Sequence, residues 1–250
     1  MSLAVIGATS VIGRETAKAF ARAGHSLLLI SRDTSGIILD DFGEGISVSQ
    51  ITCFDSGISC TSNIEPMAAR IIDSFDDNPY VLLAVGTLGD AQFDGDELSN
   101  LLEIMDVNLR NLAAVVMPVA RELEIRKRGC LVFLSSVAGD RGRQSNFIYG
   151  ASKAGLSIFA QGLRNQLFHS GVHVLTVKLG YVDTPMFRQS LRSHKYNAPS
   201  FLVGNPAKVG EKIFQAATKK KNVVYLERIW WSIMFIVRNI PESIFKRLRL

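Results

Sequence analysis

The sequence predicts a doubly wound α/β fold built around a parallel sheet of about seven strands. Short apolar runs of strand length alternate along most of the chain with longer segments of helical periodicity. This repeated strand–helix order is typical of a parallel sheet covered by helices on both faces. With 250 residues and 47% hydrophobic residues, the chain can bury the core of one large domain.

Each expected strand is a mostly apolar run, as strands buried on both faces of a sheet usually are. The strands are expected at residues 2–7, 26–31, 47–52, 80–85, 130–134, 173–179 and 222–226. The expected helices lie between them, at residues 12–23, 64–75, 98–127, 149–169 and 206–218. No repeat or low-complexity linker divides the sequence. We therefore expect one domain over residues 1–227, followed by a helical appendage over residues 228–250.

Composition excludes several classes of function. The three cysteines form no C-x-x-C pair and the four histidines are scattered, so we expect no metal site and buried free thiols in a reducing compartment. The first residues enter a strand without a basic leader. No stretch reaches the roughly 18 apolar residues that a spanning helix needs. The sequence thus favours a cytoplasmic protein.

The net charge of +5 is concentrated at the C-terminus. Residues 219–250 contain eight Lys or Arg and two Glu, a net charge of +6, so the remainder is close to neutral. An anionic surface is the expected partner, whereas no motif for nucleic-acid recognition accompanies these charges. Residues 228–238 are apolar almost all round and contain Trp230 and Trp231. They suit either a buried or subunit-interface helix, or a helix lying peripherally at the inner membrane face.

A short turn after the first strand has the composition of a phosphate-binding turn. Gly7 and Gly13 bracket it, and Thr9, Ser10 and Ile12 lie between them. Glycine lets the backbone approach a diphosphate closely, and the helix that follows supplies free N–H groups and a favourable dipole. An ordinary strand–helix turn is the alternative.

The second strand ends in Arg32 and Asp33. In dinucleotide-binding folds an acidic residue at this tip bonds the ribose 2′-hydroxyl of NAD, whereas an Arg accommodates the 2′-phosphate of NADP. Arg32 therefore favours NADP, and Asp33 leaves NAD open. Alternatively, both charges belong to a solvated turn.

Tyr149 and Lys153 are four residues apart at the start of an expected helix, so their side chains share one face. A neighbouring ammonium is expected to lower the pKa of a tyrosine, which can then exchange a proton with a carbonyl or alcohol oxygen. Ser136 follows the strand at 130–134, where a parallel sheet binds its ligand. Asn108 is a poor helix former inside an expected helix, which suggests a polar role beside Lys153.

Taken together, these motifs resemble the short-chain dehydrogenase/reductase family and its Rossmann-type fold. The resemblance spans about residues 2–185 and includes the segment 179–184, LGYVDT. It implies that Ser136, Tyr149, Lys153 and Asn108 form the catalytic set. It also implies a set of residues around the cofactor, with Asp55 near the adenine and with Gly86, Val182, Thr184, Tyr149 and Lys153.

Three residues depart from the family pattern. Val11 stands where the middle glycine of the turn is usual, which puts the local diphosphate fit in doubt. Ala84 replaces an asparagine before Gly86, and Leu179 replaces a proline. None of these changes removes a catalytic group.

Two short segments resemble a narrower group of reductases. Residues 84–90, AVGTLGD, and 240–248, IPESIFKRL, are similar to the keto-reductases that take part in decaprenylphosphoryl-ribose epimerisation. This resemblance implies a keto-sugar substrate linked to a polyprenyl phosphate, a role in cell-envelope sugar metabolism and a partner oxidase. We also expect a homo-oligomer.

The expected activity is therefore an NADPH-dependent, reversible reduction of a small-molecule or lipid-linked ketone. A nucleotide-sugar epimerase or dehydratase is an alternative that shares the Tyr/Lys pair, although those chains are commonly longer. A non-catalytic NADP-binding sensor or scaffold is another, against which the retention of all four catalytic residue types argues. The segment 186–201 is expected to cover the substrate.

Overall fold

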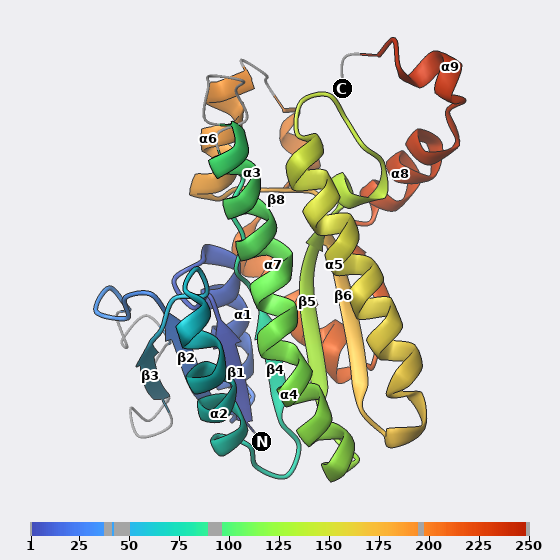
Figure 1. Cartoon of the computed structure of the whole chain (residues 1–250). Coiled ribbons are helices and arrows are strands. Elements are labelled where there is room, and N and C mark those ends of the chain that lie inside the picture. The colour runs from blue at the N-terminus through green and yellow to red at the C-terminus, as the bar shows by residue number, and fades with distance from the viewer. Residues whose placement is uncertain (1, 38–41, 43–50, 90–96, 195–197, 249–250) are drawn as a thin grey trace.

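Seven parallel strands form the central sheet of the computed structural model (Figure 1). The structure describes residues 2–37, 42, 51–89, 97–194 and 198–248. The strand order is β3-β2-β1-β4-β5-β6-β9, so the order reverses at β1, as in doubly wound folds. Two residues each from β7 and β8 form a separate parallel pair. The predicted fold class is confirmed.

The strands are short, and most of them are buried in the centre of the sheet. Five of the sheet strands contain mostly buried residues, whereas the edge strands β3 and β9 are more exposed, because each has one neighbour. In chain order the strands are β1 (Ser2–Ile6), β2 (Ser26–Ser31), β3 (Ile51–Asp55), β4 (Tyr80–Leu83), β5 (Cys130–Ser136), β6 (His173–Leu179), β7 (Tyr181–Val182), β8 (Val203–Gly204) and β9 (Val223–Leu226).

Two helical layers cover the sheet. One face packs against α2, α4 and α5, and the other against α1 and α7 (Figure 1). Each layer encloses its own apolar cluster. The helices are α1 (Val11–Arg22), α2 (Ile64–Asp73), α3 (Glu97–Met105), α4 (Asn111–Arg126), α5 (Phe147–Gln166), α6 (Pro185–His194), α7 (Pro206–Thr218), α8 (Ile229–Asn239) and α9 (Glu242–Phe245).

Several predicted boundaries need correction. The expected helix at 98–127 is interrupted by a π-helical turn, Asp106–Arg110. The helix expected to reach residue 169 ends at Gln166 and is followed by a 3-10 turn. Strand β5 runs two residues further than expected, and most of the expected strand at 47–52 lies outside the described residues. Of the cysteines expected to be buried, only Cys130 is, whereas Cys53 and Cys60 are exposed.

Helix α8 lies beyond the carboxyl ends of the strands, at the right of Figure 1. One of its faces is buried through Trp230 and Met234, which pack on Val137. The opposite face exposes Trp231 and Phe235. One face of α8 therefore packs against the domain, and the other presents apolar side chains to solvent. Within the described part of the chain, no helix has the length and hydrophobicity needed to cross a membrane.

Candidate active site

A cavity of about 540 Å³ opens at the carboxyl ends of the central strands. Its walls come from the turn after β1, the ends of β2, β4, β5 and β6, the start of α5 and the segment around α6. This is the crevice in which parallel α/β sheets bind their ligands. Ser136, Tyr149 and Lys153 all line it, although they come from two different elements.

The turn after β1 is shaped for close approach of a ligand. Gly7 has φ +91°, and a Cβ there would lie 2.9 Å from the Ala84 carbonyl carbon. A Cβ on Gly13 would lie 2.7 Å from the Gly7 oxygen, so both positions require glycine. Ser10 caps α1 by accepting a hydrogen bond from the Gly13 N–H at 2.9 Å. Val11 lines the cavity without disturbing this cap. The turn thus fits a diphosphate at the positive end of α1.

Arg32 lies at the tip of β2 and lines the cavity, while Asp33 does not. The Arg32 stem packs against Gly57, where a Cβ would lie 2.9 Å from its Cγ. The Asp33 carboxylate instead accepts a hydrogen bond from the Ser35 N–H at 2.8 Å, and its bonds with Ser35 lower its pKa. The acidic side chain is engaged in its own loop, and the basic one lines the cavity.

Asp55 is placed at the same end of the sheet but not on the cavity wall. Its Oδ1 accepts hydrogen bonds from the N–H and the hydroxyl of Thr34, at 2.8 and 2.6 Å. The neighbouring wall is made by Ser56, Ile58 and Ser59. The geometry gives Asp55 a role in joining the loops after β2 and β3, and its expected contact with the adenine stays a prediction.

Tyr149 lies in the first turn of α5, opposite Ser136 at the end of β5. The Ser136 hydroxyl accepts a hydrogen bond from the Ala138 N–H at 3.1 Å and donates one to the Leu179 carbonyl at 3.3 Å. The Lys153 ammonium lies 5.8 Å from the centre of the Tyr149 ring and donates to the Leu134 carbonyl at 3.2 Å. The predicted group is therefore brought together from two elements.

The pKa of Tyr149 differs from the sequence-based expectation. Burial raises it to about 12, and the hydrogen bond with Ser136 offsets this only in part. Burial also lowers the pKa of Lys153 to about 8. The net lowering of the Tyr149 pKa that the sequence led us to expect is not found in this structure, because desolvation of the phenolate dominates. Tyr149 is consequently a protonated group at neutral pH and is suited to donating a proton.

Asn108 is held in the π-helical turn between α3 and α4, and its side chain is fully buried. Its Nδ2 donates to the Thr87 carbonyl and to the Ser152 hydroxyl, while its Oδ1 accepts from the Thr87 N–H. A Cβ on Gly86 would lie 3.2 Å from the Lys153 Nζ and 3.5 Å from the Asn108 Oδ1, so Gly86 leaves room where these groups meet. Such π turns occur frequently at functional sites.

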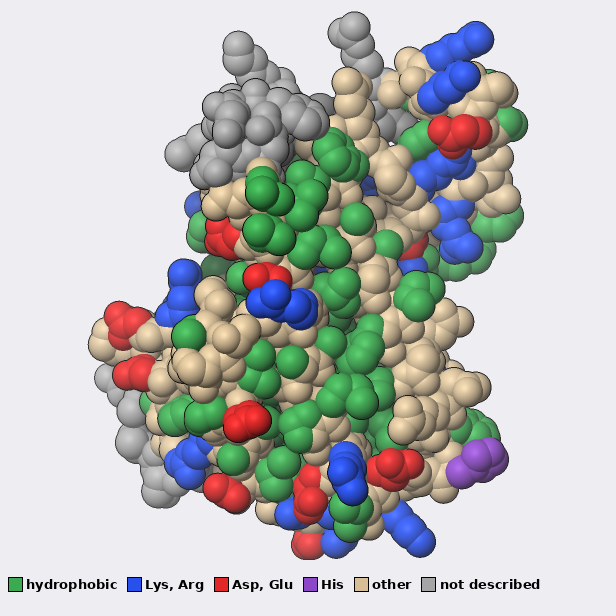
Figure 2. Space-filling view, in the orientation of Figure 1, with side chains coloured by type: hydrophobic (Ala, Val, Ile, Leu, Met, Phe, Trp, Pro, Cys, Tyr) green, Lys and Arg blue, Asp and Glu red, His purple; other side chains and the backbone are tan. Residues whose placement is uncertain are grey.

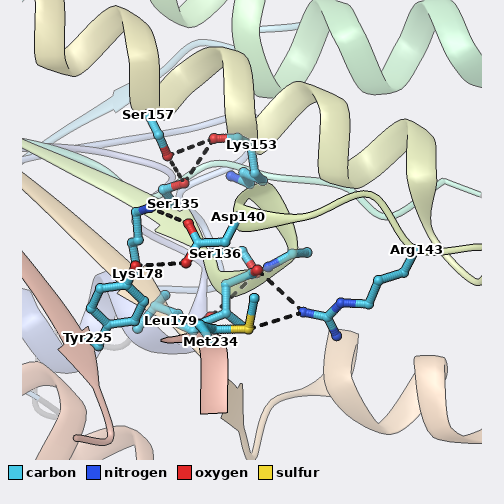
Figure 3. Close-up of polar contacts among 12 residues, drawn as sticks. Ser135, Ser136, Asp140, Arg143, Lys153, Ser157, Lys178, Leu179, Tyr225 and Met234 are labelled. Atoms are coloured by element: carbon cyan, nitrogen blue, oxygen red, sulfur yellow. Dashed lines mark hydrogen bonds and ion pairs between the residues drawn. The ribbon is translucent and has the colours of Figure 1, made fainter. Parts of the chain in front are cut away.

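Polar residues that were not anticipated from the sequence support the site (Figure 3). Ser135 donates to the Lys153 carbonyl at 3.0 Å and shares a hydrogen bond with Ser157 at 2.7 Å. Asp140 forms an ion pair with Lys178 and accepts a hydrogen bond from the Tyr225 hydroxyl at 2.7 Å. Their partners lie far apart in sequence, so no local pattern identifies them.

The far wall of the cavity is largely apolar. Val182 and Thr184 line it after β6, and Thr184 Oγ1 accepts a hydrogen bond from the Phe187 N–H. Their expected contact with the nicotinamide stays a prediction. Tyr181 and Phe187 stack with ring centres 5.0 Å apart. Tyr196, within the segment expected to cover the substrate, lies outside the described residues.

Comparison with known proteins identifies the family. A family model described as short chain dehydrogenase matches residues 2–195. The chain belongs to the short chain dehydrogenase family. An uncharacterized oxidoreductase of Streptomyces coelicolor is 30% identical over 99% of this chain and 95% of its own length.

Solved short chain dehydrogenases share the fold. One from Sphingobium yanoikuyae, in complex with NADPH, has a TM-score of 0.78 at 20% identity, covering 97% of both chains. A variant of the actinorhodin polyketide ketoreductase with NADPH has a TM-score of 0.76 at 22% identity, covering 90% of this chain and 95% of that one. The protein is thus an oxidoreductase that uses a nicotinamide nucleotide, as expected from its family.

Proposed function

We propose that this chain reduces a ketone with NADPH, and that Tyr149 protonates the carbonyl oxygen. The observation that carries this proposal is the position of Tyr149 beside Ser136 and Lys153 in the cavity that starts at the Gly7 turn. The placement of Arg32 on the wall and of Asp33 off it supports NADP over NAD. NADPH in solved structures of the same fold is consistent with this choice.

The roles of the individual residues follow from their positions. The nicotinamide, when bound, supplies the hydride. Gly7 and Gly13 admit the diphosphate, and Val182 and Thr184 lie where they can border the nicotinamide. Ser136 holds the substrate oxygen within reach of the Tyr149 hydroxyl. Lys153 bears the charge that stabilises the phenolate after proton transfer, and Asn108 fixes the backbone around it.

Replacing the proton donor tests this activity. Tyr149→Phe should lower the rate of NADPH-dependent ketone reduction by about 10²–10⁴-fold, because general acid catalysis contributes that much. Cofactor binding should remain, since the ring is retained. A purified variant that keeps more than about a tenth of the wild-type rate would contradict the assignment. A screen of NADPH oxidation with free and lipid-linked keto-sugars identifies the substrate.

We infer further that the substrate is a keto-sugar linked to a polyprenyl phosphate and that the C-terminal tail lies on an anionic membrane. The exposed face of α8 carries Trp231, Phe235 and Ile236, all more than half exposed. Arg238, Lys246 and Arg247 follow in sequence. Aromatic and basic side chains together suit a membrane interface, where each basic residue contributes about 1 kcal/mol. A partner oxidase remains part of this proposal.

Vesicle sedimentation tests the membrane contact. Full-length protein should pellet with vesicles that contain anionic lipid, and a Trp231→Ser/Phe235→Ser double variant should pellet less. Phe168→Ser is a matched control, because Phe168 is a similarly exposed aromatic residue on the 3-10 turn after α5. Truncating the tail is a poorer test, since it also removes the buried Trp230 and Met234. Wild-type protein that stays in the supernatant would refute the membrane contact.

The expected homo-oligomer has a candidate surface. Figure 2 shows hydrophobic side chains gathered over α3, α4 and α5. Leu98, Met117 and Ile158 are each at least half exposed there. A gathering of exposed apolar side chains of this kind favours association of copies. Light scattering of wild-type protein and of a Met117→Glu variant would test it, with a monomeric wild type as the refuting result.

A further inference from the structure

One cation at the cavity has no matching anion among the described residues. Arg143 follows the turn after β5 and lines the cavity with Tyr149 and Tyr181. One guanidinium nitrogen donates to the Val137 carbonyl at 3.3 Å and lies 3.9 Å from the Met234 sulfur (Figure 3). Its Nε is buried and has no hydrogen-bond partner. No ion pair within the described part of the chain includes Arg143.

Two acidic residues, Asp140 and Glu103, are relevant to Arg143, and neither forms an ion pair with it in the described part of the chain. Asp140 pairs with Lys178 and accepts from Tyr225, so both of its carboxylate oxygens are engaged. Glu103 lines the cavity from α3, and it forms no ion pair with Arg143 in the described structure. Burial correspondingly lowers the Arg143 pKa, although Tyr181 and Asp140 oppose this shift. A cation in such surroundings is costly unless an anion joins it.

We propose that Arg143 binds an anionic phosphate group of the substrate, close to the reacting carbonyl. A guanidinium offers several donors in a planar fork that matches the oxygens of such a group. Asn146 lines the same cavity and has a buried Oδ1 without a partner, so the polar surface there extends beyond Arg143. This inference rests on the proposed ketone reduction for the position of the carbonyl, and it specifies the charge of the substrate.

The position of Arg143 also connects the tail with the substrate end of the cavity. Met234 comes from the buried face of α8 and contacts the guanidinium. The helix that exposes Trp231 to solvent thus places its other face behind the proposed anion site. A lipid phosphate and a water-soluble sugar phosphate both offer the required group, and the test separates them.

Binding to the full-length protein saturated with NADP⁺ measures the anion site without turnover. Calorimetric titrations would use farnesyl phosphate, ribose 5-phosphate and uncharged farnesol. Arg143→Gln should weaken binding of the phosphates about ten-fold or more, as expected for lost charged hydrogen bonds, and leave farnesol and NADP⁺ unchanged. Arg143→Lys should bind the phosphates with intermediate affinity, because lysine keeps the positive charge but lacks the planar guanidinium group. Arg188→Gln is the matched control, since Arg188 is exposed and paired with Asp183.

The outcomes separate the two proposals. Equal phosphate affinity in wild type and Arg143→Gln, or no phosphate binding to wild type at millimolar concentration, would overturn the anion site. Tighter binding of farnesyl phosphate than of ribose 5-phosphate identifies a lipid source, and the reverse order identifies a soluble sugar phosphate. If Tyr149→Phe retains turnover while Arg143-dependent binding persists, only the proposed proton donor fails.

Discussion

Trp230 and Trp231 are adjacent in sequence, and the structure predicts opposite consequences for their loss. Trp230 is 4% exposed and stands in edge-to-face contact with Tyr181, with ring centres 4.8 Å apart. It lies so close to Gly180 that a Cβ there would be 1.9 Å from the indole Nε1. Trp231 is 58% exposed and stacks on Phe235. Of these two tryptophans, only Trp230 packs α8 against the domain.

The expected difference in stability is large. Truncating a buried Trp to Ala costs about 3–5 kcal/mol. For a domain of this size each kcal/mol lowers Tm by about 2–4 °C, so Trp230→Ala should lower it by about 6–20 °C. Trp231→Ala should change the free energy of unfolding by no more than about 0.5 kcal/mol, because surface substitutions have small effects.

Thermal unfolding of the two variants, followed by calorimetry or circular dichroism, measures this contrast. The protein has two tryptophans, so each variant leaves a single tryptophan, which can be excited selectively. The emission of Trp230 alone should be shifted to the blue relative to that of Trp231 alone. If Trp231→Ala lowers Tm as much as Trp230→Ala, or if the emission order is reversed, the described orientation of α8 is wrong.

Three further predictions concern charged groups. The lowering of the Lys153 pKa from 10.5 to about 8 corresponds to about 3 kcal/mol of destabilisation at pH 7. The penalty disappears as pH rises from about 8 to 10.5, because the unfolded chain then binds more protons. Lys153→Met should therefore be more stable than wild type at pH 7, and urea unfolding that shows a pH-independent difference would contradict this. Arg32→Ala should weaken the binding of NADPH about ten-fold or more and the binding of NADH only slightly. Equal losses of affinity for the two nucleotides in a binding titration would refute the 2′-phosphate contact. Asp140→Asn should lower the free energy of unfolding by about 3–5 kcal/mol, since it leaves the Lys178 charge without its buried partner; an unchanged denaturation midpoint would show that this pair contributes nothing.

The alternation of apolar runs and amphipathic segments was sufficient to predict the architecture. Residues 26–31, 173–179 and 206–218 were predicted with the bounds that the structure has. Continuous burial on both faces leaves few other structures for such runs. The π-helical turn at Asp106–Arg110 was not predicted, because a single inserted residue hardly changes the periodicity of the segment around it.

The site was predictable where one motif carries its own geometry. Tyr149 and Lys153 share a helix face at a spacing of four, and the tight Gly7 turn needs no distant partner to be recognised. The direction of the shift in the Tyr149 pKa was less predictable. The sequence suggests that Lys153 lowers the tyrosine pKa, but burial of both groups outweighs that influence.

The sequence by itself determined the fold class, the family resemblance and the pairing of Tyr149 with Lys153 on one helix face, because each depends on patterns that are local in the chain. Only the tertiary structure decided which face of α8 is buried, that Asp140 joins Lys178 to Tyr225, and that Arg143 reaches the cavity. These features join residues that are tens of positions apart. Their energies depend on which groups are removed from water together, and that is settled when the strands and helices pack.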